Sequence, residues 1–404
     1  MPSLFNGRKI LLCMTGGIAA YKVCDWIRLF KKEGAEVTVL MTRAAGRFIA
    51  SHTPAALSGN RVYSEMFVEE RAHEIPHINL ARDHDLILIA PATANTMARL
   101  AHGLADDLLS AVVLASRSRV VVCPAMNSDM YLHPATQINM ETLKDLGYEV
   151  VQPGEGTMAC GEEGPGRLPE WEDILEIAAR SVSSQDLAGK SVLITAGPTE
   201  EPLDPVRFLS NRSSGKMGYA LARMAWRRGA EVNLVSGPTA LSCPTGVKLT
   251  SVRTAGEMHD EVISRCGEVD FVIKAAAVSD LRPRNFSAVK IKKSGASDSL
   301  GLTANPDILA ELGDLKKEGR IQAVLAGFAA ESGNLVEEGK RKLTSKGLDL
   351  IVVNNILADD AGFASENNRV IIIDREKQVT ELPLLSKEET ANRIWDAIRS
   401  RCQQ

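Results

Sequence analysis

Short runs of apolar and β-branched residues alternate with longer helix-compatible stretches along the chain. In the first half, these runs are Lys9–Met14, Glu36–Met41, Asp85–Ala90, Arg119–Cys123 and Tyr148–Val151. Each run has apolar residues on both alternating faces, which is typical of strands buried on both faces. Buried strands that alternate with helices predict a parallel, doubly wound α/β sheet.

The same pattern begins again after a break. Residues 181–189 are mostly small and polar, which predicts a linker. Further strand-like runs follow it: Ser191–Thr195, Glu231–Val235, Val247–Val252, Asp270–Lys274, Gln322–Ala326, Leu348–Val353 and Val370–Asp374. The segment Gly-Ala-Glu-Val at 34–37 also returns at 229–232, at the end of the first strand–helix unit of each half. We therefore expect two doubly wound Rossmann-like domains, 1–180 and 190–404.

Composition excludes several classes of protein. No apolar run approaches the roughly 18 residues that a membrane-spanning helix needs, so we expect no membrane partner. The 47 Lys and Arg residues are balanced by 51 Asp and Glu residues, which argues against a nucleic-acid partner. The seven cysteines are dispersed and form no C-x-x-C pair. Free thiols in a reducing cytoplasm are therefore expected.

Ligands of open α/β sheets bind beyond the carboxyl ends of the strands. In the first half, Gly16 and Gly17 follow a strand and let backbone N–H groups approach a phosphate. The segment lacks G-x-G-x-x-G, and Thr42 stands where a dinucleotide enzyme carries an acidic residue. This favours a mononucleotide over NAD. Taken alone, the glycine pair is also compatible with a tight turn that binds nothing.

Two residues of the first half are candidates for acid–base chemistry. His73 and His77 match the zinc pattern H-E-x-x-H, but Pro76 interrupts the helix face that zinc ligation needs. His77 is then either a base or cation in the cleft, or a histidine at the start of a surface helix. Cys160 lies in a polar, Gly-flanked loop at 153–167. An exposed thiol there suits proton donation or redox work, and an incidental surface thiol is the alternative.

In the second half, the residues that follow the strands are again polar and rich in glycine. They are 196–204, 236–238, 275–280, 327–331 and 354–355. The segment 211–218 contains Gly-Lys without the spacing of a P-loop, which disfavours a Walker-type NTPase. Basic clusters at 290–293 and 340–346 are either solvated faces or part of a site for a nucleoside triphosphate, with Asp280 and Asp307 as possible Mg²⁺ partners.

Motifs in both halves resemble known enzyme families. In the first half, Thr-Gly-Gly-Ile-Ala-Ala-Tyr-Lys at 15–22, Ile-Pro-His-Ile at 75–78, Ala-Pro-Ala-Thr-Ala-Asn at 90–95, Pro-Ala-Met-Asn at 124–127 and Ala-Cys-Gly at 159–161 resemble flavin-containing cysteine decarboxylases. In the second half, the motifs at 195–199, 203–207, 210–218, 290–293, 305–308 and 327–331 resemble phosphopantothenate–cysteine ligase. Their joint order over nearly the whole chain resembles the bifunctional bacterial family of coenzyme A biosynthesis.

For the first half, the resemblance implies a flavodoxin-like domain that converts 4′-phosphopantothenoylcysteine to 4′-phosphopantetheine with FMN. The cysteine moiety is oxidised toward a thioaldehyde, CO₂ leaves, and the enethiolate takes a proton from Cys160 and a hydride from the reduced flavin. His77 would act beside the flavin, and Asn127 would hold the departing carboxylate. The implied FMN-binding residues are Gly16, Gly17, Thr42, Thr93 and Asn95.

For the second half, the resemblance implies a nucleotide-binding ligase that joins L-cysteine to 4′-phosphopantothenate. CTP, with Mg²⁺ or Mn²⁺, would activate the carboxylate as an acyl-cytidylate, and the cysteine amine would displace CMP. Asn211 would hold the acyl intermediate, while Lys290 would neutralise charge as the cytidylate forms. The implied CTP-binding residues are Asp280, Lys290, Pro306, Asp307, Ile308, Leu309, Phe328, Lys342 and Lys346, and no metal ligand is assigned.

The resemblance also implies a cytoplasmic homo-oligomer that acts on small molecules. Its flavin domain would form trimers and its ligase domain dimers, with sites at subunit interfaces. Glu200 and His84 depart from the pattern of the family and have no implied role. Two other functions stay open: a nicotinamide-dependent reductase built on two Rossmann units, which the missing G-x-G-x-x-G argues against, and a non-catalytic flavoprotein regulator.

Overall fold

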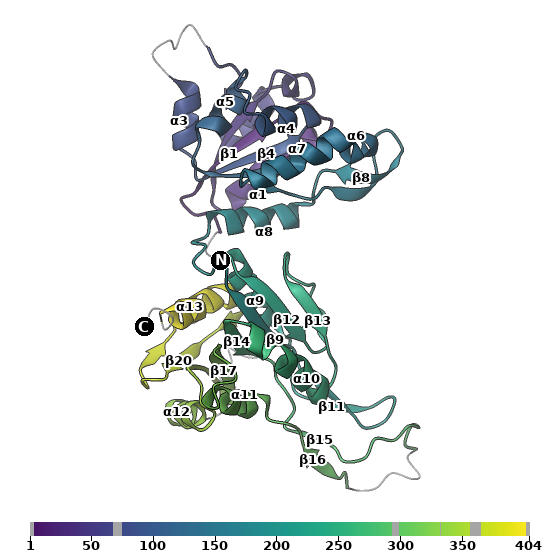
Figure 1. The fold of residues 1–404 in the computed structure, drawn as a ribbon, viewed down its shortest axis with the longest axis vertical. Coiled ribbons are helices and arrows are strands. Elements are labelled where there is room, and N and C mark those ends of the chain that lie inside the picture. The colour runs from purple at the N-terminus through teal and green to yellow at the C-terminus, as the bar shows by residue number, and fades with distance from the viewer. Residues whose placement is uncertain (1–3, 68–74, 293–298, 332, 356–364, 401–404) are drawn as a thin grey trace. The chain divides into compact units, whose positions relative to one another are not determined.

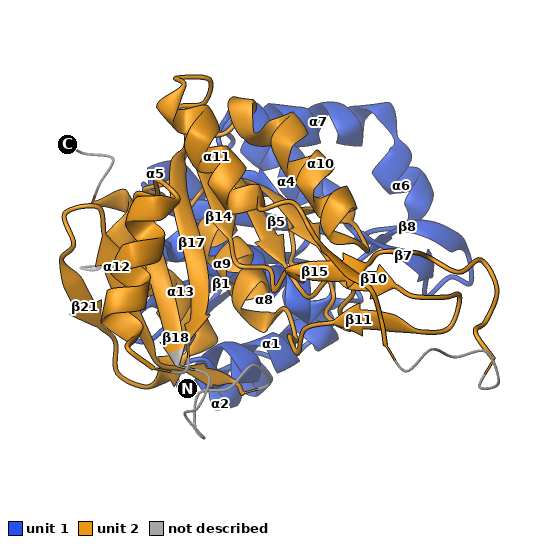
Figure 2. Cartoon of the chain, turned by 90° about the horizontal axis from the view of Figure 1, so that it is seen from below, with its two compact units in different colours: residues 1–184 blue, residues 185–404 orange. Residues whose placement is uncertain are grey.

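The computed structural model describes residues 4–67, 75–292, 299–331, 333–355 and 365–400 (Figure 1). The chain divides into two compact units, residues 1–184 and residues 185–404 (Figure 2). Helix α8 (Trp171–Val182) is the last helix of unit 1, and Leu187 is already buried in the core of unit 2. Within the described ranges, no helix has both the length and the apolar character that crossing a membrane requires.

Unit 1 is built on a six-stranded sheet in the order β3-β2-β1-β4-β5-β6, and all its strand pairs are parallel. The strands are β1 (Lys9–Met14), β2 (Glu36–Met41), β3 (Val62–Tyr63), β4 (Leu86–Ala92), β5 (Arg119–Pro124) and β6 (Glu149–Val150). Residues of α1 (Ala20–Lys32) and α8 pack on one face of the sheet. The other face is covered by α3 (Pro76–Arg82), α4 (Ala94–Ala101), α5 (Leu108–Ala115) and α7 (Pro134–Asp145). Two short helices complete the unit, α2 (His52–Ser58) and α6 (Ser128–Leu132).

Unit 2 contains an eight-stranded sheet in the order β13-β12-β9-β14-β17-β18-β20-β21. The strands are β9 (Ser191–Ala196), β12 (Glu231–Ser236), β13 (Lys248–Ser251), β14 (Phe271–Lys274), β17 (Val324–Glu331), β18 (Leu350–Asn355), β20 (Val370–Asp374) and β21 (Val379–Glu381). The pairs β18–β20 and β20–β21 are antiparallel, and the others are parallel. Helices α9 (Lys216–Arg227) and α13 (Lys387–Arg399) pack on one face (Figure 1). The other face carries α10 (Ala255–Arg265), α11 (Ile308–Lys317) and α12 (Leu335–Ser345).

Every strand predicted from the sequence is present, and the doubly wound α/β class is confirmed in both units. The predicted ends of some strands were wrong, because these strands continue into segments that we expected to be loops. β17 continues through Phe328 to Glu331 because β18 pairs with it as far as Asn355, so these backbone groups find partners in the sheet. β4 likewise includes Pro91 and Ala92, and β18 includes Asn354.

The segment 153–167 is a hairpin and not the open loop that the sequence analysis expected. β7 (Gly154–Thr157) pairs antiparallel with β8 (Glu163–Arg167), and Cys160 lies in the turn between them. The many glycines hid this strand pair because glycine disfavours strands in general. Short antiparallel strand pairs also occur in unit 2, among them β10 (Glu200–Pro202) with β11 (Phe208–Ser210), and β15 (Leu281–Pro283) with β16 (Leu302–Ala304).

Candidate functional site

The loops after β1, β2 and β4 meet at Thr15 and Gly16. The Thr15 hydroxyl is buried, donates to the Pro91 carbonyl and accepts from the Thr93 amide at 3.1 Å. A Cβ added to Gly16 would lie 2.4 Å from the Cβ of Ala44, so only glycine allows this approach of the β2 loop. The carboxyl edge of the sheet thus carries a close-packed glycine turn, which fits a phosphate-bearing ligand.

The other residues predicted to bind FMN lie at the same edge. Thr93 caps the start of α4, where its hydroxyl accepts from the Thr96 amide at 3.3 Å. The Thr42 hydroxyl accepts from the Ala45 amide at 3.2 Å, while Asn95 is exposed in the first turn of α4. The two threonines therefore fix the loops that surround the glycine turn, and Asn95 leaves its side chain open to solvent.

A thiol, an amide and a carboxylate meet at the turn between β7 and β8. Asn127 caps α6, and its Oδ1 accepts from the Asp129 amide at 2.9 Å. Its Nδ2 lies 3.7 Å from the sulfur of Cys160 and donates to the carboxylate of Glu162. The sulfur lies 3.5 Å from the same oxygen, Oε2 of Glu162. The structure therefore brings Asn127 and Cys160 together and adds Glu162, which the sequence did not distinguish from Glu163.

Glycine holds this hairpin against the start of α6. The Met126 amide donates to the Gly166 carbonyl at 2.9 Å, and the Ser128 hydroxyl donates to the Pro165 carbonyl at 2.7 Å. Gly166 has a φ of +134°, and a Cβ there would lie 2.2 Å from the carbonyl oxygen of Met126. Both neighbours of Asn127 in the sequence are therefore bonded to β8, and the approach requires glycine at position 166.

His77 lies in the first turn of α3, directly after Pro76, and is half-buried. Pro76 begins this helix and Ile75 is its N-cap; His73, the other histidine of the zinc pattern, lies outside the described residues. In the described part of the chain, no hydrogen bond or ion pair joins His77 to Asn127 or Cys160. Within the described residues of unit 1, His77 is therefore not joined to the contact between Asn127 and Cys160.

The cysteines differ sharply in their surroundings. Burial raises the pKa of the Cys13 and Cys123 thiols well above the ordinary value, so they stay protonated and inert. Among the described cysteines, Cys160 and Cys243 are the exposed ones. Cys160 also contacts the amide of Asn127, from the start of α6, and the carboxylate of Glu162 in its own turn.

In unit 2, Asn211 lies over the loop that follows β14. Its Nδ2 donates to the carbonyls of Val278 at 3.0 Å and Ala277 at 3.3 Å. That loop is bonded in turn to the loop after β9, because the Ser279 amide donates to the Thr199 hydroxyl at 3.0 Å. Asn211 is therefore held at the carboxyl edge of the sheet, where a ligand is expected.

Four of the residues predicted to bind CTP gather around the start of α11. Asp307 caps this helix and lies 2.9 Å from the ammonium of Lys346. Burial opposes ionisation, but hydrogen bonds from Lys346 and a helix amide hold the pKa of Asp307 below its ordinary value. Lys342 pairs with Glu331 at 2.6 Å, and the Asp280 carbonyl accepts from the Asn305 amide at 2.9 Å. Two basic side chains are thus fixed beside an acidic helix start.

The remaining residues of that set are divided by the sheet. Pro306 precedes the cap, while Ile308 and Leu309 are buried in the core under α10, α11 and α12. Phe328 packs against the core on the opposite face, with α9 and α13. Side chains along a strand alternate between the two faces of the sheet, and the position of Phe328 in β17 puts its side chain on that face. The structure therefore does not bring the Phe328 side chain together with Leu309.

Lys290 is exposed on a segment anchored by a buried carboxylate. The Ile291 amide donates to Asp204 at 3.2 Å, and the Arg207 guanidinium donates both to Asp204 and, at 2.8 Å, to the Ile291 carbonyl. The hydrogen bond from Arg207, with three backbone amides, holds the pKa of Asp204 well below its ordinary value. The sequence analysis missed this anchor, although both residues lie in the Leu-Asp-Pro-Val-Arg motif at 203–207.

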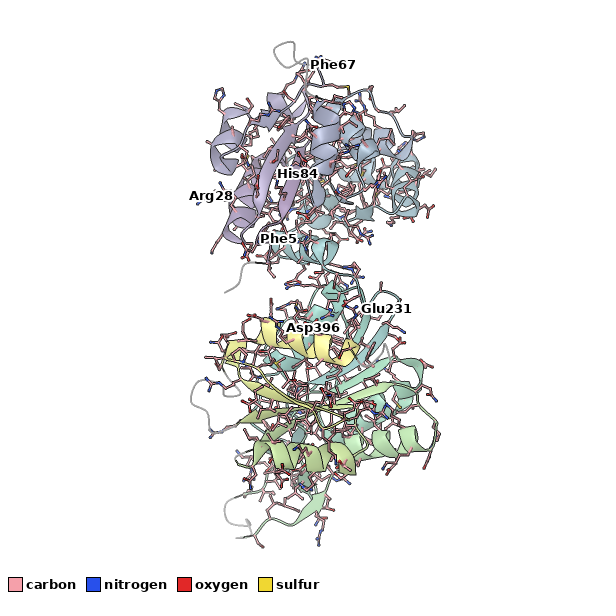
Figure 3. All side chains as sticks on the ribbon, turned by 90° about the vertical axis from the view of Figure 1, so that its left-hand side faces the viewer. Phe5, Arg28, Phe67, His84, Glu231 and Asp396 are labelled. Carbon is pink, nitrogen blue, oxygen red and sulfur yellow. The ribbon has the colours of Figure 1, made fainter. Side chains whose placement is uncertain are left out.

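The two positions that depart from the pattern of the family serve local structure. His84, labelled in Figure 3, is buried, and its Nδ1 lies 2.9 Å from the Leu80 carbonyl. Burial lowers the pKa of His84. Glu200 accepts a hydrogen bond from Arg253 at 3.0 Å. Within the described ranges, no three His, Cys, Asp or Glu side chains gather in a way that would hold a metal ion.

Comparison with known proteins covers almost the whole chain. A family model described as "Flavoprotein" matches residues 2–183, and one described as "DNA/pantothenate metabolism flavoprotein C-terminal domain" matches residues 187–402. The coenzyme A biosynthesis bifunctional protein CoaBC of Bacillus subtilis is 43% identical over 405 residues, which is 99% of either chain. That of Vibrio vulnificus is 42% identical over 396 residues, 98% of either chain. A crystal structure of the C-terminal domain of such a protein is 42% identical, with a TM-score of 0.47, and covers 55% of this chain and 99% of its own.

Proposed function

Since the chain belongs to the family of bifunctional coenzyme A biosynthesis proteins, we propose that it makes 4′-phosphopantetheine in two steps. Unit 2 joins L-cysteine to 4′-phosphopantothenate, and unit 1 decarboxylates the product. The observation that supports this assignment is that one chain holds both clusters, Cys160 with Asn127 in unit 1 and the groups around Asp307 in unit 2. Each cluster lies in the unit matched by the corresponding family model.

In unit 1, FMN bound at the glycine turn supplies reversible hydride transfer. The backbone of Gly16 and Gly17 holds its phosphate, and Thr42, Thr93 and Asn95 complete the cradle. Asn127 Nδ2 binds the substrate carboxylate, which replaces Glu162 as the acceptor of that hydrogen bond. After CO₂ has left, the Cys160 thiol donates its proton to the enethiolate carbon, and the exposed turn lets solvent reprotonate the sulfur.

His77 acts beside the flavin in this proposal, and we place it at an interface between copies of unit 1. Two points support this placement: the family resemblance implies a trimer, and no contact within one described chain links His77 to Cys160. Unit 2 would form dimers in the same way. Size-exclusion chromatography should give a species much larger than one chain, and a monomer at micromolar concentration contradicts the interface.

In unit 2, a carboxylate must be activated before an amine can attack it, because carboxylate is a poor electrophile. CTP supplies the activating group, and its phosphates lie among Asp280, Lys342, Lys346 and the start of α11. The backbone of Pro306 to Leu309 and of Phe328 completes the nucleotide site, because the side chains of Ile308 and Leu309 are buried and that of Phe328 faces the opposite core. Asn211 holds the acyl intermediate above the β14 loop.

Two further groups complete the ligase proposal. Lys290 projects from the segment anchored on Asp204 and neutralises charge as the cytidylate forms. Mg²⁺ in such sites is bound mainly by substrate phosphates with one or two carboxylates, and we assign one of these carboxylates to Asp280, whose side chain is exposed. We place the enzyme in the cytoplasm, where its free thiols stay reduced.

One assay tests the whole proposal. The purified protein should be yellow and, with 4′-phosphopantothenate, L-cysteine, CTP and Mg²⁺, should release pyrophosphate and then CO₂. Absence of pyrophosphate from an otherwise folded, flavin-loaded protein would favour the non-catalytic regulator. Substrate-dependent oxidation of NADPH would instead favour the reductase.

A further inference from the structure

Lys274 is a half-buried lysine that none of the proposed steps uses. It is the last residue of β14, and it pairs in register with Thr195 of β9 and Gly327 of β17. The sheet is parallel here, so Lys274 lies at the carboxyl edge, in the middle of the strand order. Val272, two positions earlier, packs in the core under α10, α11 and α12. Alternation along the strand places the Lys274 side chain on that same face.

The charged groups on the elements around Lys274 are those of the proposed nucleotide site. Lys346, Asp307, Asp280 and Lys342 all act on its ammonium electrostatically. Asp307 is already paired with Lys346, and Lys342 with Glu331 at the end of β17. In the part of the chain that the structure describes, Lys274 itself has no hydrogen bond or ion pair through its side chain.

An ammonium withdrawn from water without a partner costs free energy. The environment of Lys274 reflects this cost, because burial, and then repulsion from Lys346, lower its pKa to about 8. A cation of this kind is stabilised when an anion arrives beside it. Perturbed groups in clefts are candidates for function for this reason.

We propose that Lys274 is a further substrate-binding residue of the ligase site, whose ammonium pairs with a phosphate oxygen of the bound nucleoside triphosphate. The inference rests on the proposed ligase function. The nucleotide is favoured over 4′-phosphopantothenate because the charges that act on Lys274 include Asp307, Lys342 and Lys346 of the proposed CTP site. Asn211, the proposed ligand of the acyl group, is instead bonded to Ala277 and Val278 further along the loop.

Lys274→Met keeps an unbranched side chain, one atom shorter, and removes the charge. We expect it to weaken CTP binding about 10- to 100-fold at pH 7, as loss of one charge-assisted contact does. The KM for 4′-phosphopantothenate and the decarboxylation of added 4′-phosphopantothenoylcysteine should stay unchanged. Lys274→Arg should restore most of the CTP affinity. Lys248→Met, which removes an exposed lysine from the edge strand β13, is the matched control and should have no effect.

Titration calorimetry with CTP and Mg²⁺ gives a second readout that a merely structural role would not move. At pH 8, binding to the wild-type protein should take up about half a proton, because the ligand completes protonation of Lys274. The uptake should be absent in Lys274→Met and Lys274→Arg, and the CTP affinity of the arginine variant should stay flat between pH 7.5 and 9. The charged groups that act on the ammonium, Asp280, Asp307, Lys342 and Lys346, are shared by all variants, as is Glu331, which pairs with Lys342.

The outcomes separate this inference from the function on which it rests. A wild-type protein that neither binds CTP nor releases pyrophosphate overturns the ligase proposal itself. A wild-type protein that does both, with a Lys274→Met variant of unchanged CTP affinity, overturns the role of Lys274. A defect confined to the KM for 4′-phosphopantothenate also overturns it.

Discussion

The side-chain amide nitrogen of Asn127 lies 3.7 Å from the sulfur of Cys160, although 33 positions separate the two residues in the chain. The contact exists because the β7–β8 hairpin returns to the start of α6 and is bonded there on both sides of Asn127. The proposed proton donor and the proposed ligand of the substrate carboxylate are therefore positioned by one docked element.

Replacing Cys160 tests the proton donor. A positioned general acid contributes roughly 10²–10⁴-fold, so Cys160→Ser should lower formation of 4′-phosphopantetheine by that factor. Release of CO₂ should persist, because the thiol acts after the carboxylate has left. Mass spectrometry should then detect an oxidised product two hydrogens short of 4′-phosphopantetheine. Cys243→Ser, at an exposed cysteine of unit 2, is the control; equal product from both variants would remove Cys160 from the mechanism.

Replacing Gly166 tests the docking of the hairpin. Gly166→Ala puts a methyl group 2.2 Å from the Met126 carbonyl, at a φ of +134°, so the hairpin must move or strain. We expect decarboxylation to fall at least tenfold, with about 1–3 kcal/mol lost from the stability of unit 1. Pyrophosphate release by unit 2 should be unaffected. Gly154→Ala in the same hairpin meets no atom closer than 3.7 Å and should behave as wild type.

A histidine between two helices of unit 2 gives stability a dependence on pH. His259 Nε2 lies 2.7 Å from Glu311 of α11, and Nδ1 lies 2.9 Å from Asp260. Burial lowers the pKa of His259, but the two carboxylates outweigh burial and raise it above the ordinary value. A histidine whose pKa is higher in the folded state than in the unfolded chain stabilises the fold. The stabilisation is complete at a pH below the pKa in the unfolded chain, near 6.5, and it is lost as the pH rises through the pKa in the folded state.

The matching experiment compares urea unfolding at pH 6 and pH 8.5. Between pH 6 and pH 8.5, the free energy of unfolding of the wild-type protein should fall by about 0.5–1 kcal/mol more than that of His259→Gln. This size is typical of an exposed ion pair. His102→Gln is the control, because His102 bonds the Ala98 carbonyl of its own helix. Parallel losses in all three proteins would exclude the histidine as the source.

A buried ion-pair network fixes the start of unit 2. The Arg228 side chain is 6% exposed, and it donates to Asp186 at 2.8 Å and to Asp396 of α13, labelled in Figure 3, also at 2.8 Å. Arg228→Met leaves Asp186 and Asp396 without this partner, so we expect the free energy of unfolding of unit 2 to fall by about 3 kcal/mol. Hydrogen exchange resolved by peptide should place the loss in α9 and α13. Arg320→Met, which breaks an exposed pair with Glu318, should change stability by less than about 0.5 kcal/mol.

The strands were predictable because each carries an unbroken apolar run, as Leu86 to Ile89 does in β4. Their ends were not, since the end of a strand depends on whether a neighbour offers a partner. Phe328 looked like a loop residue from its Gly neighbour, yet β18 extends alongside it. Pairing between distant segments leaves no local signal in the chain.

The site was predictable where a motif fixed the residue type and the loop that carries it. Asn127 and Cys160 were expected together, and they are in contact. The role of Glu162 in that contact was not predictable. Glu162 and Glu163 have the same side chain, and only the geometry of the turn brings Glu162 to the thiol. From the sequence, Lys274 was only the last residue of an apolar strand. The proposed role in nucleotide binding depends on the charged residues that the fold brings near it.

The ion pairs of Asp186 have one more consequence. Asp186 is almost the first residue of unit 2, and it also contacts Arg399 at the end of α13, almost the last residue that the structure describes. The beginning and the end of this unit are therefore held side by side. A unit whose two ends meet can be excised, expressed alone or joined to another protein at either end without rethreading its chain. The bifunctional chain can then be described as a fusion of two self-contained units, which evolution or protein engineering can separate again.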